Sequence, residues 1–298
     1  MSAVTAARAP ARPRGRTALV ELAVLEMRRY ARHPLFLIGV ALTALASITG
    51  PDARTSSFFH NIVSAAALGV LGLVATASLA RSSRLLGRAA GVTPIPERVQ
   101  TGALALACLL PFAAGLLWFA WAVWAYRTSP PPPNGFPFGP VDEGWKLSVL
   151  FGTGVVSALG GPLLGLAIGR WWPHRGVAPM AAVLLVAVVV VMQGLLEPLR
   201  RIRVVMPFTY WGGPFGIEGD PERMIIMTGS PQWWVAYLLC LCGLAVVAAL
   251  WHDPGARTPR LRAVGVALLS GAVVTCLLAM FTGIDATLVN PLPGPPLS

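Results

Sequence analysis

The sequence predicts an all-α integral membrane protein, a bundle of six to seven transmembrane helices preceded by an amphipathic interface helix. Hydrophobic residues make up 55% of the 298 residues and charged residues only 12%, whereas soluble domains carry about 25% charged residues. Seven apolar runs also separate the polar segments of the chain. These runs cover residues 35–49, 62–80, 101–126, 147–168, 177–196, 233–251 and 263–281.

The lengths of these runs suit a lipid bilayer. Crossing the hydrocarbon core takes about 20 helical residues, which six runs provide. The run 35–49 is shorter and requires local thinning of the bilayer. The predicted organisation is therefore a disordered basic arm over 1–16, an interface helix over 17–33, a transmembrane domain over 34–283 and a flexible tail over 284–298.

The arginines predict the orientation of the bundle. The net charge is +11, and most arginines fall in alternate polar segments, before the first run, after the second, after the fourth and after the sixth. Cytoplasmic loops are enriched in Lys and Arg. We therefore expect a multi-pass protein of the bacterial cytoplasmic (inner) membrane, with a cytoplasmic N-terminus and an extracellular C-terminus. Residues 1–33 hold no apolar core and are not expected to form a cleavable signal peptide.

The sequence lacks the chemical groups that several classes of function require. The only lysine, Lys146, lies in no phosphate-binding loop, so the chain is not expected to bind ATP in that way. No acidic or basic residue lies at the centre of a run, which disfavours ion-coupled transport. No zinc or magnesium motif is present. We therefore predict no enzyme activity, cofactor, metal site or nucleic-acid binding.

The segment 17–32 predicts an amphipathic helix. Small and apolar side chains gather on one side of a helical wheel, namely Leu19, Ala23, Met27, Tyr30 and Ala31. Charged ones gather on the other, namely Glu21, Arg28 and Arg32. Glu26 can reach Arg29 at i+3. Such a helix lies in the membrane interface, where it serves either as a topological anchor or as a platform for a cytoplasmic partner.

The segment 81–98 predicts a rigid loop. A short basic helix over 81–90, with Arg81, Arg84 and Arg88, is expected to end at Gly91. Pro94 and Pro96 then impose an extended turn, and Glu97 and Arg98 lead into the next run. This rigidity favours a mechanical contact over a simple tether.

Small residues recur every four positions in the fourth run, at Ser157, Gly161, Gly165 and Gly169. Such a stripe lets two helices approach closely. The partner is a helix of the same subunit or of a second subunit, and the first is favoured. The long outer segment 197–232 is rich in Gly and aromatic residues and is either a set of short helices dipping into the interface or a surface loop.

Together these features resemble a known family. The interface helix ends in Arg-His-Pro-Leu-Phe (32–36), a basic loop with a Pro turn follows the second run, and Gly-Ser-Pro-Gln-Trp-Trp-Val-Ala-Tyr-Leu-Leu (229–239) begins the sixth. Over residues 17 to 251 this order is similar to the permease subunits of type-2 ABC transporters, particularly actinobacterial exporters. The family pattern has six spans and a cytoplasmic C-terminus, so the run 263–281 is a departure from it.

The resemblance implies a permease that works as a homo- or heterodimer with a separate ABC ATPase subunit, which hydrolyses the ATP. Segment 17–32 would be the interface helix, segment 81–98 the coupling helix and segment 197–232 the re-entrant helices. The ATPase-contact residues would be Glu21, Arg28, Arg32, Arg81, Arg84, Arg88, Pro94, Pro96, Glu97 and Arg98. The alternatives are a non-transporting membrane protein that anchors or regulates a partner and, less favoured, a membrane enzyme acting on lipids.

Overall fold

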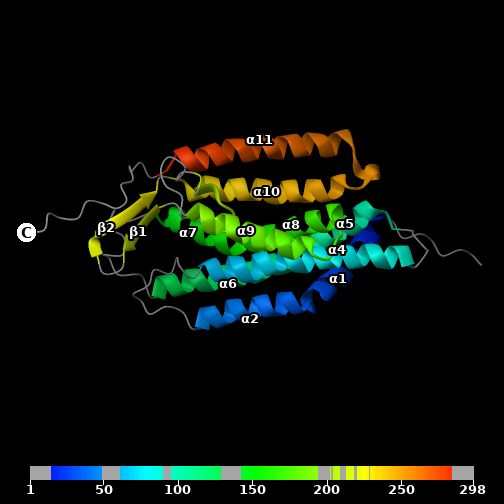
Figure 1. Ribbon diagram of the computed structural model, residues 1–298, viewed down its shortest axis with the longest axis horizontal. Helices are drawn as coiled ribbons and strands as arrows, with labels where there is room; N and C mark the ends of the chain where they lie inside the picture. Colours follow the sequence, from blue (N-terminus) through cyan, green and yellow to red (C-terminus); the bar gives the residue numbers. More distant parts are fainter. Residues whose placement is uncertain are drawn as a thin grey trace, which may run out of the picture.

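The protein is a bundle of long helices that run along one common direction (Figure 1). The computed structural model describes residues 15–48, 61–89, 95–128, 142–193, 202, 204–208, 213–217, 220–227 and 229–283. Each predicted apolar run is helical over its described residues, apart from a one-residue break at Cys108. The predicted helical membrane bundle is therefore confirmed. Of the predicted arm over 1–16, residues 1–14 lie outside the described residues and residues 15 and 16 belong to the first helix. The predicted tail over 284–298 lies outside the described residues.

The N-terminal half holds three helical passages. The first is α1 (Gly15–Ala31) followed by α2 (Pro34–Ile48). The second comprises α3 (Asn61–Ser64), the π-helical segment η1 (Ala65–Val70) and α4 (Leu71–Ala89). The third joins α5 (Glu97–Ala107) to α6 (Leu109–Thr128).

The C-terminal half holds four passages and a hairpin. The first comprises α7 (Glu143–Phe151), the π-helical segment η3 (Gly152–Val156) and α8 (Ser157–Trp171). Helix α9 (Val177–Gln193) and the strands β1 (Gly213–Ile217) and β2 (Asp220–Met227) follow. Helix α10 (Pro231–Trp251), a 3-10 turn η5 (Pro254–Ala256) and α11 (Pro259–Phe281) end the described chain.

Five of these helices are long and apolar enough to cross a membrane, and six if α1 and α2 count as one broken span. The two are bent by 61° at the break, where the sequence predicted one at His33–Pro34. Helix α9 is apolar but shorter. Helix α11 is 23 residues long, so the last run is long enough to span.

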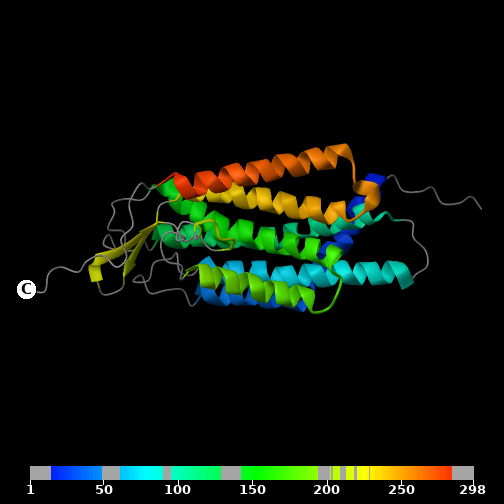
Figure 2. The ribbon, with the colours of Figure 1, turned by 45° about the horizontal axis from the view of Figure 1, so that its top comes forward.

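Helix α8 occupies the centre of the bundle. In Glu143–Trp171, 78% of the 18-residue apolar stretch is buried, against 11% in α11. Helix α11 lies at the edge of the bundle beside α10 (Figure 2). Glycines make the close packing of α8 possible. A Cβ at Gly161 would overlap the backbone oxygen of Gly69, and one at Gly165 would overlap that of Leu73. The small-residue stripe of α8 therefore packs against η1 and α4 of the same chain.

Two local expectations change. The predicted basic helix over 81–90 is helical in its described residues, 81–89, but it is not a separate helix, because α4 continues without a break from Leu71 to Ala89 and no Gly or Pro interrupts residues 73–86. The outer segment 197–232 forms no short α-helices in its described part but an antiparallel hairpin of β1 and β2. Gly and Pro at 213, 214 and 216 disfavour a helix there. The segment nevertheless enters the bundle, because Val204, Val205 and Phe208 are buried.

Candidate functional site at the basic end of the bundle

Positive charge gathers at one end of the bundle, which we call the basic end. It comprises α1, the C-terminal part of α4, the N-terminus of α5 and the α8–α9 and α10–α11 turns (Figure 1). The arginines with described side chains there are Arg28, Arg29, Arg32, Arg81, Arg98, Arg170, Arg175, Arg257, Arg260 and Arg262. The opposite end carries the hairpin and, in the described part of the chain, Arg127, Lys146 and Arg223. Segments far apart in sequence thus form one charged surface.

A polar cluster connects α1 to α4. Arg29 Nη1 lies 2.7 Å from Glu26 Oε1, the i+3 pair that the sequence predicted. Arg29 also donates to Ser82 Oγ at 2.7 Å and Ser83 Oγ at 3.0 Å, and Ser83 Oγ donates to Glu26 Oε1 at 3.0 Å. The Glu26 side chain is only 6% exposed, so water screens this cluster little. Helix α1 is therefore firmly attached where the predicted coupling segment begins.

A second cluster centres on Glu97, the first residue of α5. Its Oε1 lies 2.9 Å from His252 Nδ1 and 3.5 Å from Arg170 Nη1. The Arg170 side chain is fully buried, although the sequence placed this residue in a polar loop after the fourth run. It lies instead in the last turn of α8. Glu97 thus joins the start of α5 to the ends of α8 and α10.

The neighbouring Arg98 strengthens this junction. Its backbone N–H donates to Asp253 Oδ2 at 3.0 Å, and its guanidinium donates to the Gly255 carbonyl at 3.2 Å. Trp171 Nε1 donates to the Ala248 carbonyl at 2.8 Å. Sequence reasoning missed Arg170, His252 and Asp253 as partners of Glu97 and Arg98. Successive loops of a multi-pass protein lie on alternate sides of the membrane. This rule assigns all five residues to the same side and could have indicated that they lie near one another.

The other predicted contact residues have different environments. Glu21, Arg28 and Arg32 are exposed on α1, and Pro96 is exposed just before α5. The exposed side of α1 also carries Val20, Val24 and Leu25, so it is mixed rather than purely polar. Arg84 and Arg88 belong to α4, but the description does not extend to their side chains, and Pro94 lies outside the described residues.

His33 forms the hinge between α1 and α2. Its Nδ1 accepts the backbone N–H of Leu35 at 3.3 Å and so caps α2. Nε2 then carries the proton and lies 2.9 Å from Ser78 Oγ, which itself donates to the Ala75 carbonyl at 2.7 Å. Burial lowers the pKa of His33 below 6.5. The hydrogen bond from the Leu35 N–H requires the neutral ring, because a protonated Nδ1 cannot accept it.

We expect acid to weaken this hinge. Because the folded-state pKa of His33 is lowered, its contribution to stability is fully present above about pH 6.5 and is lost as the pH falls through the folded-state pKa. In thermal unfolding of the purified protein, the Tm should be a few degrees lower at pH 5.5 than at pH 7.5. A fall of this size is expected from the loss of one helix cap.

The control for this experiment separates His33 from other groups. His33→Asn keeps an acceptor for the Leu35 N–H but does not titrate, so the pH dependence should shrink. His174→Gln, at an exposed histidine of the same end, should leave it unchanged. Equal pH dependence in wild type and His33→Asn would contradict the assignment.

An apolar groove lies between α8, α9 and α10. Its volume is about 360 Å3, and it is lined among others by Leu164, Leu185, Phe208, Leu241 and Ala245. Phe208 adopts a left-handed backbone conformation with φ of 70°, which is strained for a bulky residue. The groove reaches the size of small-molecule sites, about 300–1,000 Å3, and its lining suits a hydrophobic chain or ring.

The described residues include no group of three His, Cys, Asp or Glu side chains able to hold a metal ion. The four cysteines are free. Comparisons with protein-family models, curated proteins and solved structures find no match to this chain. Helix length and composition therefore define a multi-pass membrane protein.

Proposed function

We propose that this chain is the permease subunit of an ABC exporter, which forms the translocation pathway and couples to a separate ATPase subunit without catalysing a reaction itself. One observation carries the proposal most: at the basic end, two clusters of charged residues join α1 to α4 and α5 to α8 and α10. A partner that moves α1 or the start of α5 would therefore move the central helices. In this proposal the basic end faces the cytoplasm, as expected for an Arg-rich surface.

The surface available to such a partner has two parts. The first is the exposed side of α1, which combines Glu21, Arg28 and Arg32 with exposed Val20 and Val24. Apolar centres flanked by charge, with arginine enriched, are typical of protein interfaces. The second is the end of α4, which projects beyond α8 and α9 in both views (Figures 1 and 2). Both parts belong to the segments expected to contact the ATPase.

The chain's own composition supports a separate source of ATP hydrolysis. Its single lysine, Lys146, lies in α7, away from the basic end. A phosphate-binding loop requires a lysine beside a helix N-terminus to reach the β- and γ-phosphates. A second permease subunit would complete the membrane part, as the family resemblance implies. The apolar groove between α8, α9 and α10 favours a hydrophobic cargo.

The first test is complex formation. Co-expression with an ATP-binding-cassette protein encoded beside this gene should yield a stable complex when the present chain carries the affinity tag. Arg28→Glu with Arg32→Glu should weaken the complex at least about tenfold, since each reversal replaces attraction by repulsion worth roughly 1 kcal/mol or more.

The matched control is Arg260→Glu with Arg262→Glu, which makes the same charge change at exposed positions of the same end. This control should retain the complex. Absence of any ATPase in the wild-type preparation would favour the alternative of a membrane protein that anchors or regulates another partner.

A further inference from the structure

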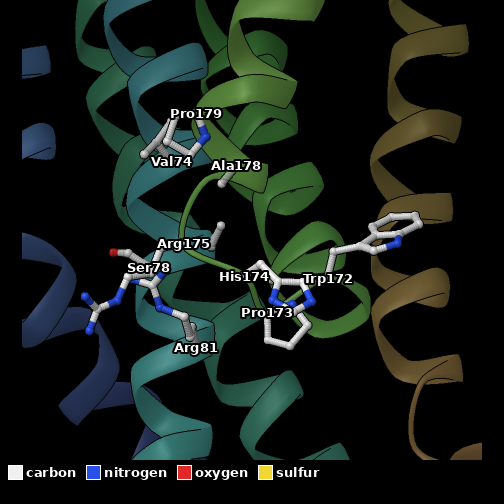
Figure 3. Close-up of a pocket in the computed structure, with 11 residues that line it drawn as sticks. Val74, Ser78, Arg81, Trp172, Pro173, His174, Arg175, Ala178 and Pro179 are labelled. Carbon is white, nitrogen blue, oxygen red and sulfur yellow. The ribbon is translucent and has the colours of Figure 1, made fainter.

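A small basic pocket lies at the same end of the bundle, between α4 and the turn that joins α8 to α9. Its volume is about 80 Å3, and its walls include Ser78 and Arg81 of α4 and Trp172, His174 and Arg175 of the turn. Figure 3 shows the side chains of Arg81, Arg175 and Ser78 close together on the α4 side, with His174 opposite. Two arginines from different elements thus converge on one cavity.

The charges of this pocket are not compensated from within the described chain. Arg29 and Arg170 form ion pairs with carboxylates, whereas Arg81 and Arg175 have no ion pair among the described residues. The pocket also lies at the N-terminus of α9, whose partial positive charge favours an anion. Placing two guanidinium groups together without a counter-ion is unfavourable, so the pocket is suited to a negatively charged group.

The size and surroundings indicate which anion. Small-molecule sites occupy about 300–1,000 Å3, so a cavity of about 80 Å3 has room for one phosphate group but not for a nucleotide. Beyond the pocket, α9 exposes a continuous apolar face with Met180, Val183 and Leu184, each more than 60% exposed. Acyl chains can cover that face, and Trp172 is exposed beside it, as is common at a membrane interface.

We propose that this pocket binds the headgroup phosphate of an anionic phospholipid, with Arg81 and Arg175 holding the phosphate and the acyl chains lying along α9. Basic pockets between transmembrane helices recognise anionic lipids in this way. The proposal gives Arg81 a role in lipid binding that does not depend on the ATPase. The bound lipid would connect α4 to α9, which share few other polar contacts in the described chain.

The test uses the purified full-length protein in detergent, without any ATPase. Added phosphatidylglycerol should raise the Tm of the wild type by several degrees, and phosphatidylcholine should raise it much less. In Arg81→Gln with Arg175→Gln, at least half of the phosphatidylglycerol effect should disappear. Arg175→Gln alone, at an exposed turn position, should give a smaller loss and serves if the double variant does not fold.

The control is Arg260→Gln with Arg262→Gln, which removes the same charge at exposed sites of the same end. Its response to phosphatidylglycerol should equal that of the wild type. Equal losses in both double variants would overturn the proposal, because they would indicate general surface attraction. An equal response of the wild type to sodium phosphate would also overturn it, since it would identify the ligand as a free anion.

Discussion

Gly161→Ala and Gly165→Ala should each lower the Tm of the protein by roughly 6–12 °C, and the double variant should not be recovered as a monodisperse protein. A Cβ at either position would overlap backbone atoms of η1 or α4, with Gly69 Cα and Leu73 Cα each at 2.8 Å. Backbone cannot rotate away as a side chain does, so we expect the upper end of the usual cost of overpacking, about 3 kcal/mol. A loss of 1 kcal/mol in the free energy of unfolding lowers the Tm by about 2–4 °C in a protein of this size, which gives the fall in Tm stated above.

The matched control is Gly160→Ala on the same helix. Its new methyl group would lie 3.2 Å from the Cys242 sulfur. The Cys242 side chain can rotate to another rotamer, so the contact can be relieved. Thermal unfolding and size-exclusion chromatography measure the difference. If Gly160→Ala proves as damaging as Gly161→Ala, the close contact of α8 with η1 and α4 is not the reason for the stripe.

Glu97→Gln should have the second large effect, a loss of about 3 kcal/mol and a fall in Tm of roughly 6–12 °C. Removing one partner of a buried ion pair costs about 3–5 kcal/mol, because the other charge stays buried. The Arg170 side chain is fully buried, whereas that of Glu97 is 29% exposed. We therefore expect a loss at the lower end of this energy range. Adding Arg170→Met should restore part of the loss, since it removes the buried charge.

The opposite end of the bundle offers a natural control. Arg127 and Glu143 also lie 3.5 Å apart, but their side chains are 66% and 67% exposed. Exposed pairs contribute about 0–1 kcal/mol, so Glu143→Gln should change the Tm by no more than about 4 °C. Similar shifts for Glu97→Gln and Glu143→Gln would show that burial of Arg170 does not matter.

The helices were predictable because lipid requires long apolar runs, and such runs can be counted. The break at His33–Pro34 was also predictable, since proline cannot continue the preceding helix. The Glu26–Arg29 pair was predictable because residues three apart on a helix lie side by side. The hairpin was missed because β1 is short and rich in glycine and because both strands lie outside the apolar runs, where the sequence signals that separate strand, helix and loop are weak.

The candidate site at the basic end was only partly predictable. Glu97, Arg170 and His252 are more than 70 residues apart in sequence, and nothing local indicates that their side chains meet. Arg170 looked like a loop residue because an arginine after an apolar run is usually exposed. The convergence of Arg81 and Arg175 on one pocket depends in the same way on how α4 packs against α8 and α9, which only the three-dimensional structure contains.

The most direct test of the proposed permease role measures coupling in a complex of this chain with the proposed ATPase subunit. Arg84→Glu with Arg88→Glu, at the end of α4, should leave the bundle folded but reduce transport-coupled ATP hydrolysis at least about tenfold. The Arg260→Glu, Arg262→Glu control should hydrolyse ATP as the wild type does. Unchanged coupling in the Arg84→Glu, Arg88→Glu complex would contradict the account.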